Sequence, residues 1–260
     1  MQLVRPSNRL AAIAALAGLA SLLTCPPVEA TVDYQLFERV LVQNVRNGYV
    51  DYEGIRADPA FVEFLAQLAE KPDATETETD SKATLALLIN AYNAFAIKGI
   101  LDGHSPVSLP GRHRYFKSLK YQLRGESISL EDLAATRIST QGDPRIHFAI
   151  VCASISCPRL WSHAYLPGQL DEQLDAAAKR FVNDITRNRF DVAQRIAFVS
   201  QIFESFQAEF ARSAGSVPAY MARYASDGAV QAALEDGRLR VKFLPYDWEL
   251  NGSVSARGAR

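Results

Sequence analysis

Ser81 to Leu101, SKATLALLINAYNAFAIKGIL, is apolar on nearly every side and decides the fold. A surface helix keeps one polar face, whereas a helix that is hydrophobic all round lies in the core. Polar groups interrupt the middle of this run at Asn90, Tyr92 and Asn93. The sequence therefore predicts a buried central helix that carries amide side chains into the core.

The two asparagines of this helix need hydrogen-bond partners, because an unpaired buried amide costs about 1–3 kcal/mol. We expect Asn90 and Asn93 to be buried and hydrogen-bonded. In one interpretation they form a structural bracket that ties loop carbonyls to the helix, with Tyr92 as a core aromatic residue. In the other, Asn93 or Asn90 orients a catalytic group or a substrate amide.

Local groups of helices and strands surround the central helix. Periodic apolar residues predict helices over residues 33–46, 59–68, 130–136 and 169–185. Strands or hairpins are expected over residues 49–52, 120–128, 145–152, 189–199 and 241–244, with an exposed polar loop over 71–82. Because helices and strands do not alternate regularly, the predicted class is α+β. We expect one helix-rich domain on a small, mainly antiparallel sheet, of a papain-like or transglutaminase-like kind.

Residues 1–30 have the pattern of a secretory signal peptide. Arg5 and Arg9 precede an apolar run from Leu10 to Leu23, and Val28-Glu29-Ala30 offers a small-x-small cleavage site. The apolar run is too short to cross a hydrocarbon core of about 30 Å. We therefore expect cleavage after Ala30.

Cleavage would leave residues 31–260 as a single periplasmic or secreted domain without a stable membrane span. Lipidation of Cys25 is the alternative, because the preceding residues loosely resemble a lipoprotein box. Apolar residues make up 48% of the chain, which is enough for an ordinary core. The 28 Lys and Arg balance 29 Asp and Glu without a basic block, so we expect no nucleic-acid partner. The histidines lack metal-binding spacing, and we expect neither a metal site nor a cofactor.

The segment DPRIHFAIVCASISCPRLW, residues 143–161, carries two cysteines. We interpret residues 145–152 as a buried strand that runs into a Ser/Cys turn. Pro158 suits the first position of a helix, with Cys157 at its N-cap. The positive end of a helix lowers the pKa of a thiol, and the N–H groups of residues 153–156 would bind an oxyanion.

His147 is the candidate base for either sulfur. On an ideal strand His147 and Cys152 point to opposite faces because their separation is odd. A bulge, or the use of Cys157 as nucleophile, would bring thiol and imidazole together. Two other interpretations stay open: Cys152 and Cys157 form a disulfide in an oxidising compartment, and His147 is a core histidine bonded to the backbone.

The C-terminal stretch Tyr246-Asp247-Trp248-Glu249-Leu250-Asn251 places an acid between aromatic residues. In a partly dry site Asp247 would orient His147 as the third member of a Cys/His/Asp set. The alternative is a C-terminal strand in which Tyr246 and Trp248 close the core while Asp247 caps a turn.

Together these motifs resemble the domain of unknown function 547 (DUF547) family. The resemblance extends over about residues 80–251 and rests on four motifs in order: INAYNA at 89–94, HFAIVC leading to SCP at 147–158, LDEQL at 170–174 and YDWELN at 246–251. It implies a fold and candidate positions without an established activity. Glu209 stands where the resemblance leads us to expect Asp. The resemblance also implies that the position of Cys157 can be Ser in relatives, which favours Cys152 as the common thiol.

Two functions are therefore open. One is a papain-like or transglutaminase-like thiol hydrolase or transferase acting on amide bonds, with Cys152 or Cys157 as nucleophile, His147 as base, and Asp247 or Asn93 orienting it. The other is a catalytically inactive periplasmic domain that binds an unidentified peptide, amide or small-molecule ligand and keeps a structural Cys152–Cys157 disulfide. A free thiol of depressed pKa would favour the first, and a quantitative disulfide the second.

Overall fold

Helix α4 (Ser81–Leu101) is the buried centre of the molecule, as the sequence predicts. The Asp80 carboxylate accepts a hydrogen bond from the Lys82 N–H and caps the helix start. From Leu85 to Leu101 every side chain except that of Lys98 is buried. Among the described residues α4 is the one helix long and apolar enough to cross a membrane, and 83% of its apolar window is buried inside the protein. That burial is typical of a core helix.

The structure is a computed structural model that describes residues 2, 32–72 and 80–254. Apart from Gln2, the predicted signal peptide lies outside the described residues, together with its cleavage site and Cys25. Positions 73–79 of the expected loop also lie outside them.

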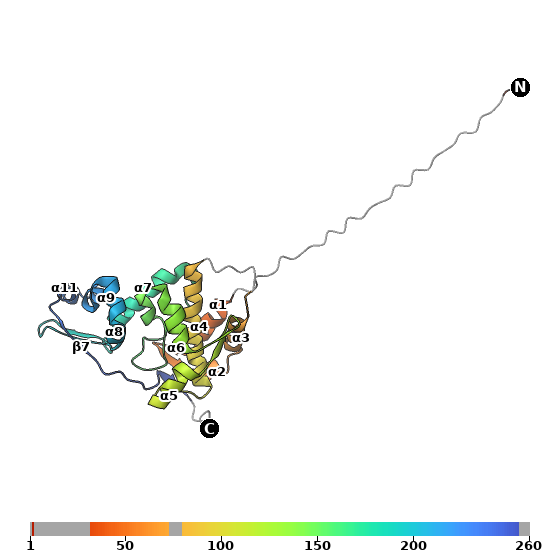
Figure 1. Cartoon of the computed structure of the whole chain (residues 1–260), viewed down its shortest axis with the longest axis horizontal. Helices are drawn as coiled ribbons and strands as arrows, with labels where there is room; N and C mark the ends of the chain where they lie inside the picture. The colour runs from red at the N-terminus through yellow and green to blue at the C-terminus, as the bar shows by residue number, and fades with distance from the viewer. Residues whose placement is uncertain (1, 3–31, 73–79, 255–260) are drawn as a thin grey trace. The chain divides into compact units, whose positions relative to one another are not determined.

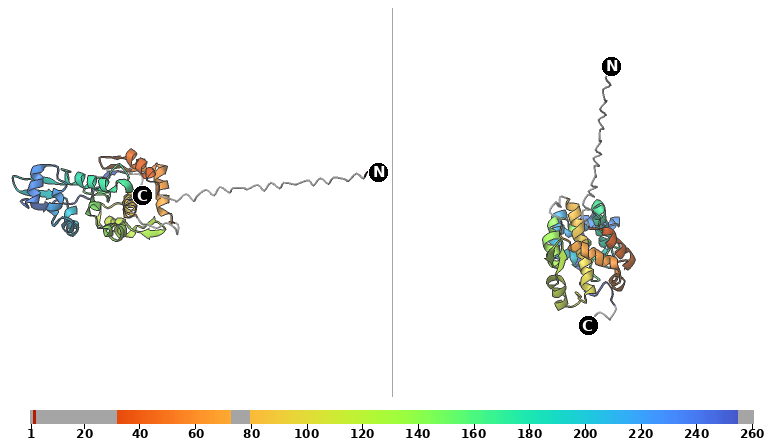
Figure 2. Two further views of the ribbon diagram at one scale, coloured as in Figure 1. Left: turned by 90° about the horizontal axis from the view of Figure 1, so that it is seen from above. Right: turned by 90° about the vertical axis from the view of Figure 1, so that its right-hand side faces the viewer.

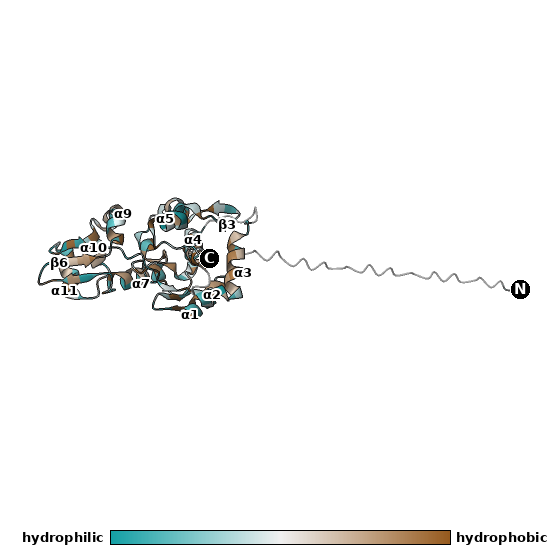
Figure 3. Ribbon diagram, turned by 90° about the horizontal axis from the view of Figure 1, so that it is seen from below, coloured by the Kyte–Doolittle hydropathy of each residue, from teal (hydrophilic) through white to brown (hydrophobic). Residues whose placement is uncertain are grey.

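The first hydrophobic core surrounds α4. Phe37 stacks on Phe64 with ring centroids 4.8 Å apart, which joins two helices of this core, and Figure 3 shows the second of them, α3, as predominantly hydrophobic. The elements of this region are α1 (Tyr34–Asn44), β1 (Val45–Arg46), β2 (Tyr49–Asp51), α2 (Tyr52–Arg56), α3 (Pro59–Ala69), α5 (Leu109–His113), β3 (Tyr121–Leu123), β4 (Glu126–Ile128) and α6 (Leu130–Asp132). Short π- and 3₁₀-helical turns complete it: η1 (Arg114–Ser118), η2 (Leu133–Ile138), η3 (Ser139–Gln141) and η5 (Pro167–Gln169).

A second hydrophobic core, rich in aromatic rings, is built by the later part of the chain. Phe148, Phe203 and Phe210 are buried at its centre. Its elements are β5 (Arg189–Asp191), β6 (Ile196–Val199), α8 (Ile202–Ser205), α9 (Gln207–Ala214), α10 (Val217–Ala222), α11 (Gly228–Glu235) and β7 (Arg240–Phe243). Helix α7 (Leu170–Val182) lies between the two groups, contributing Leu174 to the first core and Phe181 to the second (Figures 1 and 2).

The α+β class is confirmed. Within residues 32–72 and 80–254 the strands form three small sheets, in the orders β1-β2-β8, β3-β4 and β5-β6-β7. Two pairings are parallel, β6 with β7 and β2 with β8 (Gly252–Ser253). In both, a strand from the C-terminal part of the chain pairs with an earlier strand. Instead of the single, mainly antiparallel sheet that we expected, the described strands form three small sheets, and two of these contain a parallel pair.

Two local expectations were wrong. Residues 145–152 are not a strand: η4 (Pro144–Phe148) is a 3₁₀ helix, started by the Asp143 carboxylate on the Arg145 N–H and by Pro144 at its first position. An apolar run alone does not distinguish a strand from a buried helical turn. The expected helix after Pro158 is absent as well, because the described residues 158–166 form no helix. Cys157 therefore lacks the helix that was to lower its pKa.

Candidate functional site

Asn90 and Asn93 are buried and clamp two irregular segments onto α4. Asn93 Nδ2 donates to the Ala149 carbonyl at 3.0 Å, and its Oδ1 accepts from the Val151 N–H at 2.8 Å. Asn90 bonds both backbone groups of Tyr165 in the same way, at 2.7 and 2.9 Å. The predicted burial and bonding are confirmed, in the form of the structural bracket.

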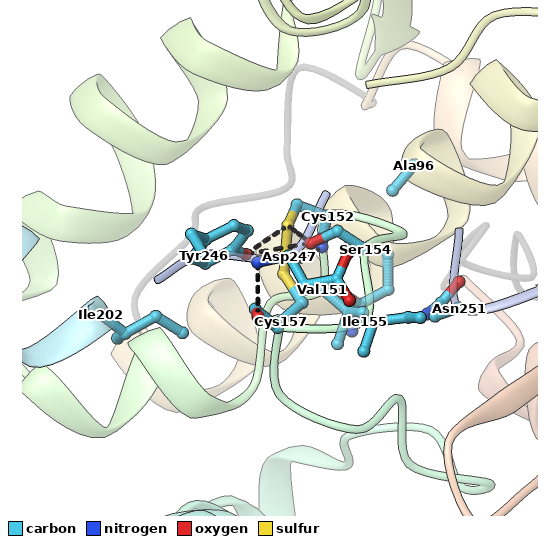
Figure 4. Close-up of a disulfide and its surroundings, with 12 residues drawn as sticks. Ala96, Val151, Cys152, Ser154, Ile155, Cys157, Ile202, Tyr246, Asp247 and Asn251 are labelled. Atoms are coloured by element: carbon cyan, nitrogen blue, oxygen red, sulfur yellow. Dashed lines mark hydrogen bonds between the residues drawn. A yellow bond between two sulfur atoms is a disulfide. The ribbon is translucent and has the colours of Figure 1, made fainter. Parts of the chain in front are cut away.

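Cys152 and Cys157 form a disulfide that closes a short loop, residues 152–157, here called the disulfide loop. The Cα atoms lie 6.1 Å apart, and the Cys152 N–H donates to Cys157 Sγ at 2.9 Å. Figure 4 shows the loop beside Tyr246 and Asp247. Both sulfur atoms are thus joined to each other in this structure.

The C-terminal segment, residues 246–251, runs along the disulfide loop and pairs with it. The Ile155 N–H donates to the Glu249 carbonyl at 2.7 Å, and the Ser156 N–H donates to the Asp247 carbonyl at 3.1 Å. Two N–H groups that were expected to bind an oxyanion therefore hold the C-terminal segment.

The Tyr246 hydroxyl lies over the disulfide. It is 3.2 Å from Cys152 Sγ and accepts a hydrogen bond from Ser154 Oγ at 3.0 Å, and Ser154 Oγ is itself 3.2 Å from the same sulfur (Figure 4). Burial raises the pKa of Tyr246, although the Ser154 hydroxyl and the charge of Arg187 act in the opposite direction. The phenol therefore stays neutral at ordinary pH.

Arg187 fixes the other side of the disulfide loop. Its Nε donates to the Cys157 carbonyl at 2.8 Å and its Nη2 to the Ile155 carbonyl at 2.6 Å. Its Nη1 bonds Asp184 at 2.7 Å. The loop is therefore held by a guanidinium, a disulfide and a backbone pairing at once.

His147 is bonded to Glu209. The Nε2–Oε2 distance is 2.8 Å, and Phe206 stacks on the imidazole with a ring-centroid distance of 3.7 Å. Burial lowers the pKa of His147, and the Glu209 carboxylate only partly offsets that effect. Within the part of the chain that the structure describes, His147 makes no hydrogen bond to Cys152, Cys157 or Asp247. Its role as a base stays a prediction.

Asp247 is occupied by its own turn. Its Oδ1 accepts from the Glu249 N–H at 2.9 Å, and its N–H donates to Ser156 Oγ at 2.8 Å. This is the turn-capping alternative that the sequence left open. The structure therefore brings Asp247 to the disulfide loop by its backbone, and gives the imidazole a different carboxylate.

A cavity of about 220 Å³ opens directly after the disulfide loop. Its buried lining residues, here called the floor, include Phe148, Leu160, Ala177 and Phe181. Its half-buried or exposed lining residues, here called the rim, include Asn47, Arg159, Trp161, Ser162, Arg180 and Asp184. Gly48 in the β1–β2 turn has φ +82° and lies against Arg159, where a Cβ would come within 2.5 Å of the Arg159 Cβ. The turn and the arginine together define one wall.

Residues 77–182 match the family model described as "Protein of unknown function, DUF547". This segment of the chain belongs to the DUF547 family. The matched segment contains Asn90, Asn93, His147, both cysteines of the disulfide loop and most of the cavity lining. Neither the curated proteins nor the solved structures gave a match to the chain, so the papain-like or transglutaminase-like expectation stays a prediction.

Sequence reasoning missed two features of this protein. The first is the partner of His147, since Glu209 was noticed only as a departure from the family pattern. The second is the cavity, whose arginines Arg159 and Arg180 drew no attention. A Trp with two arginines within about twenty positions was the available signal, but only the fold places them on one rim. Among the described residues no group of three or more His, Cys, Asp or Glu side chains is arranged to hold a metal ion.

Proposed function

We propose that this DUF547 protein is an exported ligand-binding domain in which the Cys152–Cys157 disulfide is structural. The observation that carries the proposal is the cavity of about 220 Å³, which combines an apolar floor with a polar rim. A concave apolar site with a few convergent polar groups is the usual form of a small-molecule site.

The neighbouring polar groups support a binding role over a catalytic one. Asn93 bonds two backbone groups, His147 bonds Glu209 through Nε2, and Asp247 bonds its own turn, although the buried Nδ1 of His147 has no partner among the described residues. The two sulfur atoms are bonded to each other. Each group that the sequence offered for catalysis therefore has a structural partner, whereas the cavity is open.

Binding is tested through the cavity's own tryptophan. Trp161 and Trp248 are the two tryptophans of the chain, so Trp248→Phe leaves Trp161 as the single reporter. A library of small molecules should contain compounds that change Trp161 fluorescence, and Ser162→Phe, which narrows the cavity rim, should weaken the same compounds. Compounds that bind both variants equally, or no binding compound at all, would count against the proposal.

The state of the sulfurs is tested on protein exported to the cell envelope. Intact-mass analysis after labelling with iodoacetamide at pH 6 should show no label on Cys152 or Cys157 before reduction. Label on either cysteine without prior reduction would contradict a structural disulfide.

A second candidate is the thiol enzyme acting on amide bonds, and one contact favours it. Cys152 Sγ lies 3.2 Å from the hydroxyls of both Ser154 and Tyr246, which would donate to a thiolate once an external thiol had reduced the disulfide. Its test is the pH at which the reduced Cys152 reacts with iodoacetamide. A midpoint well below the ordinary thiol pKa of about 8.5 would support the thiol-enzyme function. An ordinary midpoint would contradict it and leave ligand binding as the one proposed function.

A further inference from the structure

The rim of the cavity carries more positive than negative charge. Arg159 bonds Asp184 through Nε at 2.8 Å and the Asn47 carbonyl through Nη1 at 2.9 Å. Asp184 also bonds Arg187 at 2.7 Å, so this carboxylate is shared between two guanidiniums. Asp184 makes no ion pair with Arg180.

Arg180 has no anionic partner. Within residues 32–72 and 80–254 no carboxylate lies within ion-pair distance of it, and its guanidinium makes no hydrogen bond to the protein. A cation in the last turn of a helix is favoured by the helix dipole, and Arg180 lies in the last turn of α7. The helix dipole explains why a positive side chain is favourable at this end of α7, but it does not explain why the Arg180 guanidinium lies at the cavity rim.

The guanidinium of Arg180 lies over the Trp161 ring, with Cζ 4.5 Å from the ring centroid. Because the ring offers no hydrogen-bond acceptor in its plane and no described residue bonds the guanidinium, its N–H groups are free to donate. That fork of donors matches a carboxylate in a bidentate manner. The indole therefore holds Arg180 ready for an anionic group.

We propose that the cavity binds a small carboxylic acid with an apolar body, the carboxylate on Arg180 and the body over Phe148, Ala177 and Phe181. This inference rests on the proposed function and names the class of its ligand. The cavity is smaller than the pockets of about 300–1000 Å³ that hold drug-sized ligands. A free small acid and the C-terminal carboxylate of a peptide share the chemistry that the site recognises.

Titration of matched probes into the Trp248→Phe protein tests the charge of the ligand. 3-Phenylpropionate should bind, whereas 3-phenylpropan-1-ol and 3-phenylpropylamine, which keep the ring and lose the anion, should bind about tenfold to a hundredfold more weakly, the range expected for one charge-assisted pair. N-acetylphenylalanine represents the peptide terminus. Binding of either acid supports a carboxylic acid as the ligand. The acid that binds more tightly shows whether the site prefers a free small acid or the C-terminus of a peptide.

Substitution at Arg180 tests the residue. Arg180→Gln should weaken the acid about tenfold or more without changing the affinity for the alcohol, and Arg180→Lys should restore part of the loss. Arg189→Gln is the matched control, because Arg189 stacks on Phe198 at 5.4 Å and is not part of the cavity lining. Calorimetry provides a second readout, since loss of Arg180 changes the surroundings of Trp161.

The outcomes separate the two proposals. If the alcohol binds as tightly as the acid and Ser162→Phe weakens both, the ligand class is wrong and the binding function stands. If neither acid binds, the carboxylate inference is overturned, while the library screen still decides whether the cavity binds another compound. If the acid binds and Arg180→Gln has no effect, Arg180 is not the receptor of the carboxylate and the inference fails.

Discussion

The asparagines of α4 and Arg180 of the cavity rim are polar groups beside apolar side chains, but the asparagines are buried and bonded, whereas Arg180 is exposed. Asn90 and Asn93 each donate to one backbone carbonyl and accept from one backbone N–H within 3.0 Å. Arg180, by contrast, has an aromatic ring beneath it and no acceptor among the described residues. A matched polar group stabilises the fold, whereas an unmatched one at a cavity is available to a ligand. The predictions below test that difference.

Replacing Asn93 with Leu should have the largest effect. The change leaves the Ala149 carbonyl and the Val151 N–H without partners in the core, and we expect a loss of about 3 kcal/mol in the free energy of unfolding. Urea denaturation measures the loss. The exposed amide Gln141, replaced by Leu, is the control and should stay within about 0.5 kcal/mol of the wild type. Equal stability of the two variants would remove the distinction between matched and unmatched groups.

Removal of the disulfide should cost somewhat less. Cys152 and Cys157 are separated by five positions, and closing so short a loop stabilises the folded chain by about 2 kcal/mol in the loop-entropy account. The Cys152→Ser, Cys157→Ser double variant should show this loss in urea and still bind ligand in the cavity. Loss of cavity binding in a variant that remains folded would mean that the sulfurs belong to the site itself.

The His147–Glu209 pair should make stability depend on pH. Because burial lowers the pKa of His147 in the folded state, the unfolded chain takes up the proton first. The contribution of neutral His147 is therefore complete above its ordinary pKa of about 6.5 and is lost as the pH falls towards the lowered folded value. One group gives a slope of at most about 1.4 kcal/mol per pH unit.

Urea denaturation of the wild type and His147→Gln from pH 8 to pH 5 isolates this slope, since other groups cancel in the difference. The stability difference between the two should shrink with falling pH. Glu209→Gln, which removes the carboxylate that raises the His147 pKa, should steepen the decline. Parallel curves for wild type and His147→Gln would show that the imidazole does not titrate differently on folding.

Tyr246→Phe should cost about 1 kcal/mol, the usual value of one intramolecular hydrogen bond. The variant loses the bond from Ser154 Oγ but keeps the aromatic contact with Trp248, whose ring centroid lies 4.5 Å away. Thermal and urea denaturation measure the change. A loss of several kcal/mol would indicate that the phenol organises the disulfide loop more strongly than its contacts suggest.

Arg180→Gln should have the smallest effect on stability. Since no acceptor in the described structure depends on this guanidinium, the free energy of unfolding should stay within about 0.5 kcal/mol of the wild type. The same variant is expected to lose ligand affinity, so it separates the two kinds of polar group in one molecule. A stability loss as large as that of Asn93→Leu would make Arg180 a structural residue.

The sequence was most informative where composition alone decides. The apolar run of 81–101 predicted a buried helix because no polar face was available, and the asparagines within it had to be bonded. It failed at residues 145–152, where the run of apolar residues concealed a helix start at Asp143-Pro144. A run of apolar residues indicates that a segment is buried, but a buried strand and a buried helical turn give the same run.

Partners distant in sequence could not be predicted. Asn93 bonds residues 56 and 58 positions away, and Glu209 reaches His147 across 62 positions. In each case the sequence shows one member of the pair without indicating the other. The turn-capping role of Asp247 was within reach, because its partner is only two residues away.

The asparagine clamps have a kinetic consequence. A carboxamide has the same kinds of donor and acceptor as a peptide group. The side chains of Asn90 and Asn93 therefore bond the backbone of irregular segments as a neighbouring strand would. The amide protons of Val151 and Tyr165 are held in this way although they lie outside every helix and strand. Their hydrogen exchange should therefore be as slow as that of the core helix, and require global unfolding.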